Sequence, residues 1–213
     1  MLVIKKNYLA LFAKSFNWAG FFLPRDTYEE CSKLYAFCRV LDDIVDADQK
    51  LDIKKERYEK INDFFKLSDE VKTKFEERYK FDQEAIIVSD MIVLIENKNI
   101  KRVILNDLVE GVGSDLKTKV YLRSVKDLLV YSYRVAGTVG LMMAKILNVN
   151  DTRSLKGAID LGIAMQLTNI ARDVIEDQKM NRQYIKPDFE NIEATLKLAD
   201  MFYESSYTSI KKI

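Results

Sequence analysis

The chain contains no histidine among its 213 residues. This absence excludes imidazole as a general base, a nucleophile or a metal ligand, so any chemistry must rest on carboxylates, arginine, lysine and tyrosine. Cysteine is scarce too, with only Cys31 and Cys38. On a helix these two residues lie two turns apart, too far for a disulfide, which favours reduced thiols in a cytoplasmic protein. With so few possible ligands, a structural zinc site is also excluded.

Proline and glycine are likewise rare, at 2 and 7 residues, whereas 48% of the residues are hydrophobic and 31% are charged. This composition is typical of a compact helical protein, and the length predicts one domain. The net charge of +1 leaves no basic field, so we expect no nucleic-acid partner. The longest apolar tract is broken by Lys145 and is shorter than the roughly 20 residues of a membrane-spanning helix, and the N-terminal stretch lacks the features of a signal peptide.

Apolar residues recur at intervals of three and four, which predicts an all-α fold. The expected helices cover residues 7–22, 26–47, 82–96, 99–115, 125–147, 151–179 and 191–213, with one more amphipathic helix after residue 47. Asp26 and Glu29 resemble a capping box at the start of the second helix. Gly137 and Gly140 lie inside a helix, where each costs about 1 kcal/mol, so we expect another helix or a ligand to approach closely there.

Two polar stripes interrupt these apolar helices, in the stretches YAFCRVLDDIVDA and QLTNIARDVIED. Positions three, four and seven apart share one face of a helix. The residues that share a face are Tyr35, Arg39, Asp42 and Asp46 in the first stripe, and Gln166, Asn169, Asp173 and Asp177 in the second. Apolar neighbours flank both stripes, so we expect an interior setting for them.

Two facing rows of buried carboxylates repel each other and are costly to desolvate. A hard divalent cation would compensate, because Mg²⁺ binds one or two protein carboxylates while keeping waters and phosphate oxygens. We therefore hypothesise that Mg²⁺ holds a diphosphate substrate between two helices. The alternative is a pair of solvated acidic faces, balanced by Arg39, Arg172 and surface lysines.

Three blocks of the sequence resemble the squalene and phytoene synthases, most closely the bacterial phytoene synthases. They read KSFNWAGFFLPRDTYEECSKLYAFCRVLDDIVDA, VYSYRVAGTVGLMM and DLGIAMQLTNIARDVIEDQKMNRQYI. The resemblance runs from about Ser15 to Tyr207. It implies a helical bundle around a central cavity, in which two DxxxD motifs bind Mg²⁺, or Mn²⁺, and prenyl diphosphate. Related enzymes continue further, so we expect one domain over 1–213 that lacks the final C-terminal helices.

The resemblance also implies roles for individual residues. The metal ligands it implies are Asp42, Asp46, Asn169, Asp173 and Asp177, with Asp43 assisting. The residues implied to contact or support the diphosphate are Ser15, Tyr35, Arg39, Gln166, Arg172, Arg182 and Tyr184. The residues implied to line the hydrocarbon channel are Tyr131, Val135, Gly137 and Gly140. Catalysis is implied for the four aspartates and Tyr131, while the two glycines are implied to make room for a polyprenyl tail.

The implied reaction joins two geranylgeranyl diphosphates head to head through a cyclopropyl diphosphate to give phytoene, for carotenoid biosynthesis. The hydrocarbon product is insoluble, so we expect a cytoplasmic protein with peripheral membrane contact. One alternative is a squalene or dehydrosqualene synthase that uses farnesyl diphosphate. Another is a non-catalytic relative that acts as an assembly factor, which the two intact aspartate motifs disfavour. An elongating prenyltransferase would need aspartate motifs of different spacing.

Overall fold

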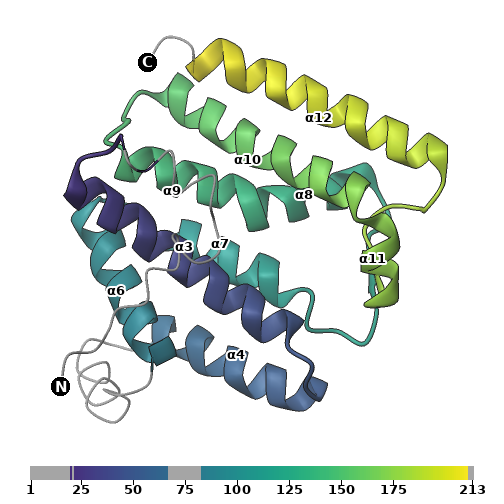
Figure 1. Ribbon diagram of the computed structural model, residues 1–213, viewed down its shortest axis with the longest axis horizontal. Helices are drawn as coiled ribbons and strands as arrows, with labels where there is room; N and C mark the ends of the chain where they lie inside the picture. Colours follow the sequence, from purple (N-terminus) through teal and green to yellow (C-terminus); the bar gives the residue numbers. More distant parts are fainter. Residues whose placement is uncertain (1–19, 21, 67–82, 211–213) are drawn as a thin grey trace.

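The computed structural model of the protein describes Gly20 and residues 22–66 and 83–210 (Figure 1). Its elements are α3 (Arg25–Asp46), α4 (Leu51–Lys66), α6 (Gln83–Asn97), α7 (Arg102–Gly113), β1 (Val120–Tyr121), α8 (Val125–Ser132), the π-helical turn η1 (Tyr133–Gly137), α9 (Thr138–Ile146), α10 (Thr152–Arg172), α11 (Val174–Lys179), β2 (Arg182–Gln183) and α12 (Phe189–Ile210). The predicted all-α fold is confirmed. The helix expected over 7–22 lies outside the described residues.

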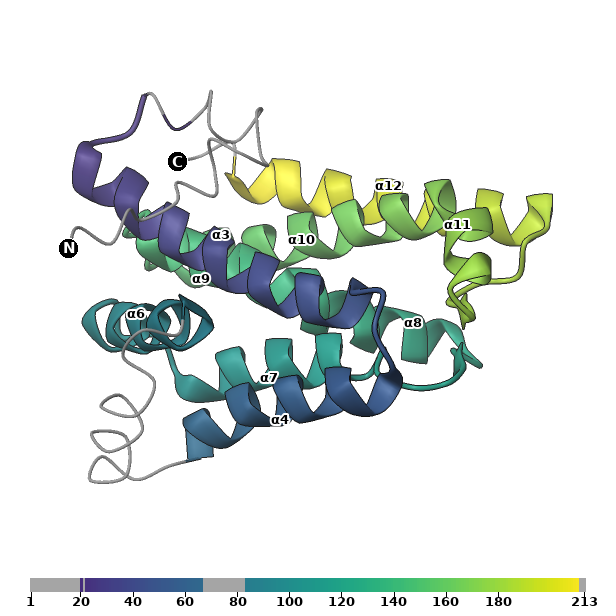
Figure 2. The ribbon, with the colours of Figure 1, turned by 60° about the horizontal axis from the view of Figure 1, so that its bottom comes forward.

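One part of the core surrounds α3, which contacts α4, α6, α7 and α9 (Figure 2). The apolar residues of α3 recur at helical intervals, and Leu34, Phe37 and Leu41 on its inner face are fully buried. Each such side chain contributes about 1.5–3 kcal/mol through its removal from water. These side chains belong to the first core cluster. Their packing fixes which face of α3 points inward, and therefore the direction in which its polar residues point.

A second core cluster lies where α10 packs antiparallel to α12 and against α8 and η1 (Figure 1). Leu128, Ile163, Leu167 and Ala199 are buried within it. The segments α8, η1 and α9 follow one another without a break, and η1 contacts both α7 and α10. Val135 in η1 packs against both clusters, so this turn stands at the junction between them.

Glycines mark the closest approach of two helix backbones. A Cβ at Gly140 would lie 2.1 Å from the carbonyl oxygen of Ala158, and one at Gly162 would lie 2.3 Å from that of Ala136. This confirms the close helix approach expected at Gly140. A Cβ at Gly137 would meet side chains of η1 and α10 at 3.1 to 3.3 Å. Because α10 occupies the space beside Gly137 and Gly140, the expectation that a polyprenyl tail fills it is corrected.

Two local predictions about helix ends are wrong. Pro24 stands at the N-cap of α3 with no side-chain capping bond, and Glu29 accepts a hydrogen bond from Arg25 at 3.1 Å instead of completing a capping box. The helix expected over 151–179 is divided at Asp173, where the backbone leaves the helical region (φ −99°, ψ 14°). Figure 1 shows α11 turned away from the axis of α10 beyond this residue.

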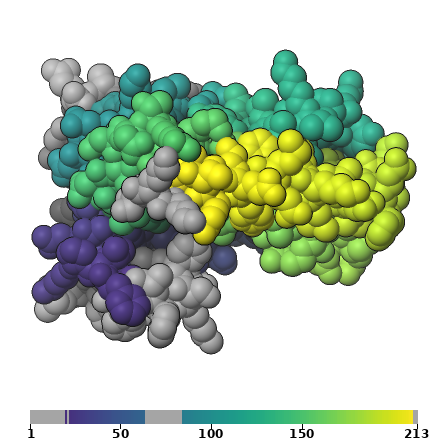
Figure 3. Space-filling view, turned by 90° about the horizontal axis from the view of Figure 1, so that it is seen from above, coloured from purple at the N-terminus to yellow at the C-terminus, as the bar shows by residue number. Residues whose placement is uncertain are grey.

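The space-filling view from above shows α12 running along the outer surface of the molecule (Figure 3). Its exposed apolar side chains include Leu196, Met201 and Tyr207. Over the ranges 22–66 and 83–210, no helix combines the length and apolar character that crossing a membrane requires.

Candidate active site

A cavity of about 640 Å³ lies at the junction of the two core clusters. Its walls come from α3, α7, α8, η1, α10 and α11 and from the loops that carry Asp115 and Tyr184. The residues that line it are Cys38, Arg39, Asp42, Val45, Asp46, Leu108, Val112, Asp115, Tyr131, Val135, Gln166, Asn169, Ile170, Arg172, Asp173, Asp177, Arg182 and Tyr184.

The cavity gathers most of the residues singled out in the sequence. Those it brings together are Arg39, Asp42, Asp46, Tyr131, Val135, Gln166, Asn169, Arg172, Asp173, Asp177, Arg182 and Tyr184. Tyr35 is half-buried against the first core cluster and, like Gly137 and Gly140, is not part of the lining. Ser15 lies outside the described residues. Asp115 lines the cavity although no sequence pattern pointed to it.

The first aspartate pair lies on α3, where buried apolar neighbours hold the helix in place. Ile44 and Val45 are buried, but Asp42 and Asp46 are exposed, so the expected interior setting is replaced by one that opens to the cavity. Desolvation by the surrounding walls raises the pKa of Asp42 to about 6, and the charge of Asp46 adds to the rise. This end of α3 therefore lacks enough positive charge to balance its carboxylates.

The second aspartate pair flanks the break between α10 and α11. Asp173 closes α10, and its carboxylate accepts two hydrogen bonds from Arg172, at 2.6 and 2.5 Å. Hydrogen bonding by Arg172 lowers the pKa of Asp173. Desolvation instead raises the pKa of Asp177 to about 6, against the opposing effect of Arg182. The pair thus combines one carboxylate that is fully ionised at neutral pH with one that loses its proton only as the pH rises through about 6.

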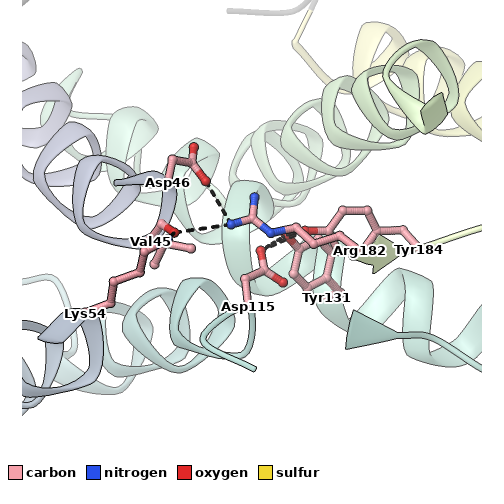
Figure 4. A network of polar contacts seen from close by, with 7 residues as sticks. All are labelled: Val45, Asp46, Lys54, Asp115, Tyr131, Arg182 and Tyr184. Atoms are coloured by element: carbon pink, nitrogen blue, oxygen red, sulfur yellow. Dashed lines mark hydrogen bonds and ion pairs between the residues drawn. The ribbon is translucent and has the colours of Figure 1, made fainter. Parts of the chain in front are cut away.

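Arg182 joins the two walls across the cavity. The parallel pair β1–β2 holds its backbone, with Val120 N–H donating to Asn181 O at 3.0 Å. Asn181 adopts the left-handed conformation (φ 58°), which asparagine tolerates and which turns the chain from α11 into β2. The Arg182 guanidinium then donates to Asp46 at 2.9 Å, as Figure 4 shows. This ion pair connects two segments that are 136 residues apart.

A hydrogen-bonded cluster forms another side of the cavity. Tyr131 and Tyr184 both donate to one carboxylate oxygen of Asp115, at 2.7 and 2.8 Å (Figure 4). The two phenol rings stack with centroids 4.7 Å apart. Burial raises the pKa of both phenols, and the charge of Asp115 adds to each rise. The tyrosines therefore stay protonated, with their hydroxyl groups anchored to one carboxylate.

The donor set in the cavity fits Mg²⁺. Its hard oxygen ligands are Asp42, Asp46, Asn169, Asp173 and Asp177. In the described part of the chain, no three acidic, cysteine or histidine side chains lie close enough together to hold an ion by themselves. Mg²⁺ commonly binds through one or two carboxylates and completes its shell with waters and phosphate oxygens. The arrangement therefore suits ions shared with a substrate's phosphate oxygens and not a closed protein cage.

Comparison with known proteins adds a family to this geometry. The family model described as squalene/phytoene synthase matches residues 9–206. A 15-cis-phytoene synthase from Paracoccus sp. is 36% identical over 186 residues, which cover 83% of this chain and 57% of that protein. Another from Enterobacter agglomerans is 35% identical over 174 residues, covering 81% and 58%. The chain thus spans a little over half the length of these curated relatives.

Solved structures give the same fold. A dehydrosqualene synthase solved in complex with a ligand superposes with a TM-score of 0.70 at 27% identity, covering 94% of this chain and 73% of that one. A squalene synthase from Alicyclobacillus acidocaldarius superposes with a TM-score of 0.67 at 19% identity, covering 95% and 80%. The helical fold is therefore that of the dehydrosqualene and squalene synthases.

Proposed function

Because the chain belongs to the squalene/phytoene synthase family, we propose that it is a prenyltransferase that joins two geranylgeranyl diphosphates head to head to form phytoene, with Mg²⁺ as its cofactor. The observation that carries the proposal is the meeting of both aspartate pairs in one cavity, although about 130 residues separate them in sequence. The same reaction implies a cytoplasmic enzyme in peripheral contact with a membrane, because its long hydrocarbon product is insoluble in water.

Arginines supply the positive charge for the departing diphosphate. The ion pairs they form are Arg39 with Asp43 at 2.7 Å, Arg172 with Asp173 at 2.5 Å and Arg182 with Asp46 at 2.9 Å. A guanidinium can pair with two phosphate oxygens at once, so each of these groups can turn from its carboxylate to the substrate. Bound Mg²⁺ supplies Lewis acidity that stabilises the diphosphate as a leaving group.

The apolar part of the cavity protects the carbocation. Its lining residues of this kind are Val45, Leu108, Val112, Val135 and Ile170. In the proposed reaction, the C1–O bond of one substrate breaks and its electron pair leaves with the diphosphate. The double bond of the second substrate then forms the new carbon–carbon bond, and loss of a proton gives the cyclopropyl diphosphate. Apolar walls exclude the water that would otherwise quench these cations.

Tyr131 is the side chain best placed to influence proton transfer. Its hydroxyl group lies at the cavity wall, and the sequence offers no imidazole for this purpose. Because Tyr131 stays protonated and directs its proton to Asp115, the departing diphosphate is the candidate proton acceptor. A second candidate function follows from the structural neighbour that is a dehydrosqualene synthase, since such an enzyme would use the shorter farnesyl diphosphate in the same cavity.

The test is incubation of the purified protein with Mg²⁺ and either geranylgeranyl or farnesyl diphosphate, followed by extraction and mass analysis of the hydrocarbon. Phytoene from the longer substrate supports the proposal, whereas squalene or dehydrosqualene from the shorter one selects the second candidate. Chelation of Mg²⁺ and the variants Asp42→Asn and Asp173→Asn should abolish product. Asp107→Asn, outside the cavity, serves as the matched control. Product that persists without divalent metal would contradict the role given to the aspartates.

A further inference from the structure

Asp115 is the acidic residue of the cavity that neither aspartate motif contains. It follows α7 by two positions, in the loop that leads to β1. Three separate segments meet at its carboxylate, because Tyr131 comes from α8 and Tyr184 from the chain just after β2 (Figure 4). A carboxylate that ties three segments together at the wall of a reaction cavity controls the orientation of the groups it holds.

The number of protons shared by the two phenols and the carboxylate decides which atoms donate and which accept hydrogen bonds. Tyr131 OH and Tyr184 OH lie 3.0 Å from each other and 2.7 and 2.8 Å from the same oxygen of Asp115. Burial raises the pKa of Asp115, but the hydrogen bonds from the two phenols and the charge of Arg182 oppose this rise and favour the ionised carboxylate. Each phenol has one proton, and the ionised carboxylate has none. Two protons therefore serve three short contacts. The charge-assisted bonds to Asp115 are the stronger ones, so both phenols direct their protons to the carboxylate.

Phenol oxygens whose O–H groups donate to Asp115 keep their lone pairs for other partners. Both tyrosines line the cavity while their rings are buried, at 8% and 7% exposure. Stacking of the rings prevents them from turning independently. The other oxygen of Asp115 is buried and, among the described residues, has no hydrogen-bond partner, so the recorded hydrogen bonds to this carboxylate come from the two phenols, with the charge of Arg182 also acting on it.

We propose that Asp115 is a positioning residue that holds the phenol protons of Tyr131 and Tyr184 away from the substrate and presents their oxygen lone pairs to the developing allylic cation. The inference rests on the proposed function, because it needs a cationic species in the cavity. Electron-rich oxygens fixed beforehand toward a developing positive charge stabilise it without reorganisation at the moment of reaction. Asp115 acts only through the two tyrosines.

The first test compares Asp115→Asn with Asp107→Asn. Asp107 also accepts a hydrogen bond from a tyrosine, Tyr133, at 3.3 Å, but lies outside the cavity. We expect Asp115→Asn to lower kcat at least about tenfold through misplaced phenols, with the KM for prenyl diphosphate changed less than about twofold. Asp107→Asn should leave both unchanged. A kcat for Asp115→Asn equal to that of the control would overturn the proposal.

The second test asks whether Asp115 acts through the tyrosines. In a chain that already carries Tyr131→Phe and Tyr184→Phe, Asp115→Asn should cause no further loss of kcat, because the groups it positions are gone. An additional loss of about tenfold in that background would show a separate role. Mg²⁺ affinity, measured by calorimetry, should be unaffected by Asp115→Asn. A loss of about tenfold or more would make Asp115 a metal ligand instead.

A third measurement separates this inference from the proposed function. Carbon-13 at the Cζ position of tyrosine reports hydrogen bonding of each phenol by NMR without any turnover. The resonances of Tyr131 and Tyr184 should shift in Asp115→Asn and stay in place in Asp107→Asn; unshifted resonances would overturn the anchoring. If the unmodified protein makes no hydrocarbon, the proposed function fails while this result still stands.

Should Asp115→Asn not fold, Asp115→Glu, which keeps the charge but displaces it, replaces it in all three tests.

Discussion

At the scale of single residues, the cavity holds carboxylates that bind protons unusually tightly. Desolvation by the cavity walls is the main cause for both Asp42, whose side chain opens to the cavity, and Asp177, and the pKa values of both rise to about 6. Their folded-state pKa lies above that of the unfolded chain. The stability they contribute is therefore fully present below about pH 4 and is lost as the pH rises through 6. A site of this kind favours a bound cation at neutral pH.

The corresponding prediction concerns Asp42→Asn in the metal-free protein. Because an amide carries no charge, the variant should lose less stability than the unmodified protein between pH 4 and pH 7, and it should be the more stable of the two at pH 7. Urea unfolding across this pH series measures the difference, with Asp107→Asn as a control outside the cavity. Parallel pH profiles for the unmodified protein and Asp42→Asn would contradict the assignment.

A second prediction at this scale concerns Arg182. Its side chain is only 12% exposed, whereas its partner Asp46 is 54% exposed. Arg182→Gln should lower the free energy of unfolding by about 1 kcal/mol, since solvent screens the exposed half of the pair. It should also raise the pKa of Asp177, which the guanidinium holds down. Arg172→Gln removes a more exposed pair and should cost less in the same urea titration; equal losses would show that burial of Arg182 contributes nothing.

The sequence could locate the aspartates but not Asp115, for a physical reason. Asp42, Asp46, Asp173 and Asp177 recur at helical spacing, so a periodic pattern exposes them. Asp115 stands alone in the loop after α7, and its partners lie 16 and 69 positions away. No local pattern encodes contacts of that length. The sequence offered only an acidic residue at the end of the helix predicted over 99–115, close to two glycines.

At the scale of elements, hydrophobic periodicity predicted the helices from α3 to α12, within a few residues wherever it gave their bounds, but not their interruptions. The pattern of four-residue steps continues through Asp173, whose N–H still donates to Asn169 O at 2.8 Å and whose carbonyl oxygen accepts from Asp177 N–H at 2.9 Å. The backbone nevertheless leaves the helical region at Asp173, so a bend separates α10 from α11. Side-chain spacing cannot reveal it, and the same holds for the π-helical turn η1.

Close helix packing yields the prediction for this scale. In Gly140→Ala, the new methyl group would lie 2.1 Å from a backbone oxygen of α10, so the helices must separate. Overpacking of this kind costs about 1–3 kcal/mol, and we expect the upper half of that range because backbone cannot move aside like a side chain. Gly137→Ala, which meets only side-chain atoms at 3.1 to 3.3 Å, is the control and should cost less. Thermal unfolding of both variants gives the comparison; a Gly137→Ala loss as large as that of Gly140→Ala would contradict it.

At the scale of the whole molecule, the site exists only because distant parts of the chain pack together. The first aspartate pair belongs to the cluster around α3, and the second to the layer of α10 and α12. The Arg182–Asp46 ion pair and Val135 are among the contacts that bridge these parts at the cavity. A ligand that binds both aspartate pairs must therefore stabilise the packing of one part on the other.

This arrangement predicts that Mg²⁺ and inorganic pyrophosphate bind cooperatively to the protein. Each ligand neutralises charge that opposes binding of the other, so each should raise the affinity for the other by the same factor. We expect that factor to be about tenfold, equivalent to about 1.4 kcal/mol. Titration calorimetry of pyrophosphate with and without Mg²⁺ measures it. Asp42→Asn and Asp177→Asn, one from each part, should each reduce the coupling, because Mg²⁺ and pyrophosphate together would need carboxylates from both walls; coupling that survives either change would show that the wall carrying the changed residue does not take part.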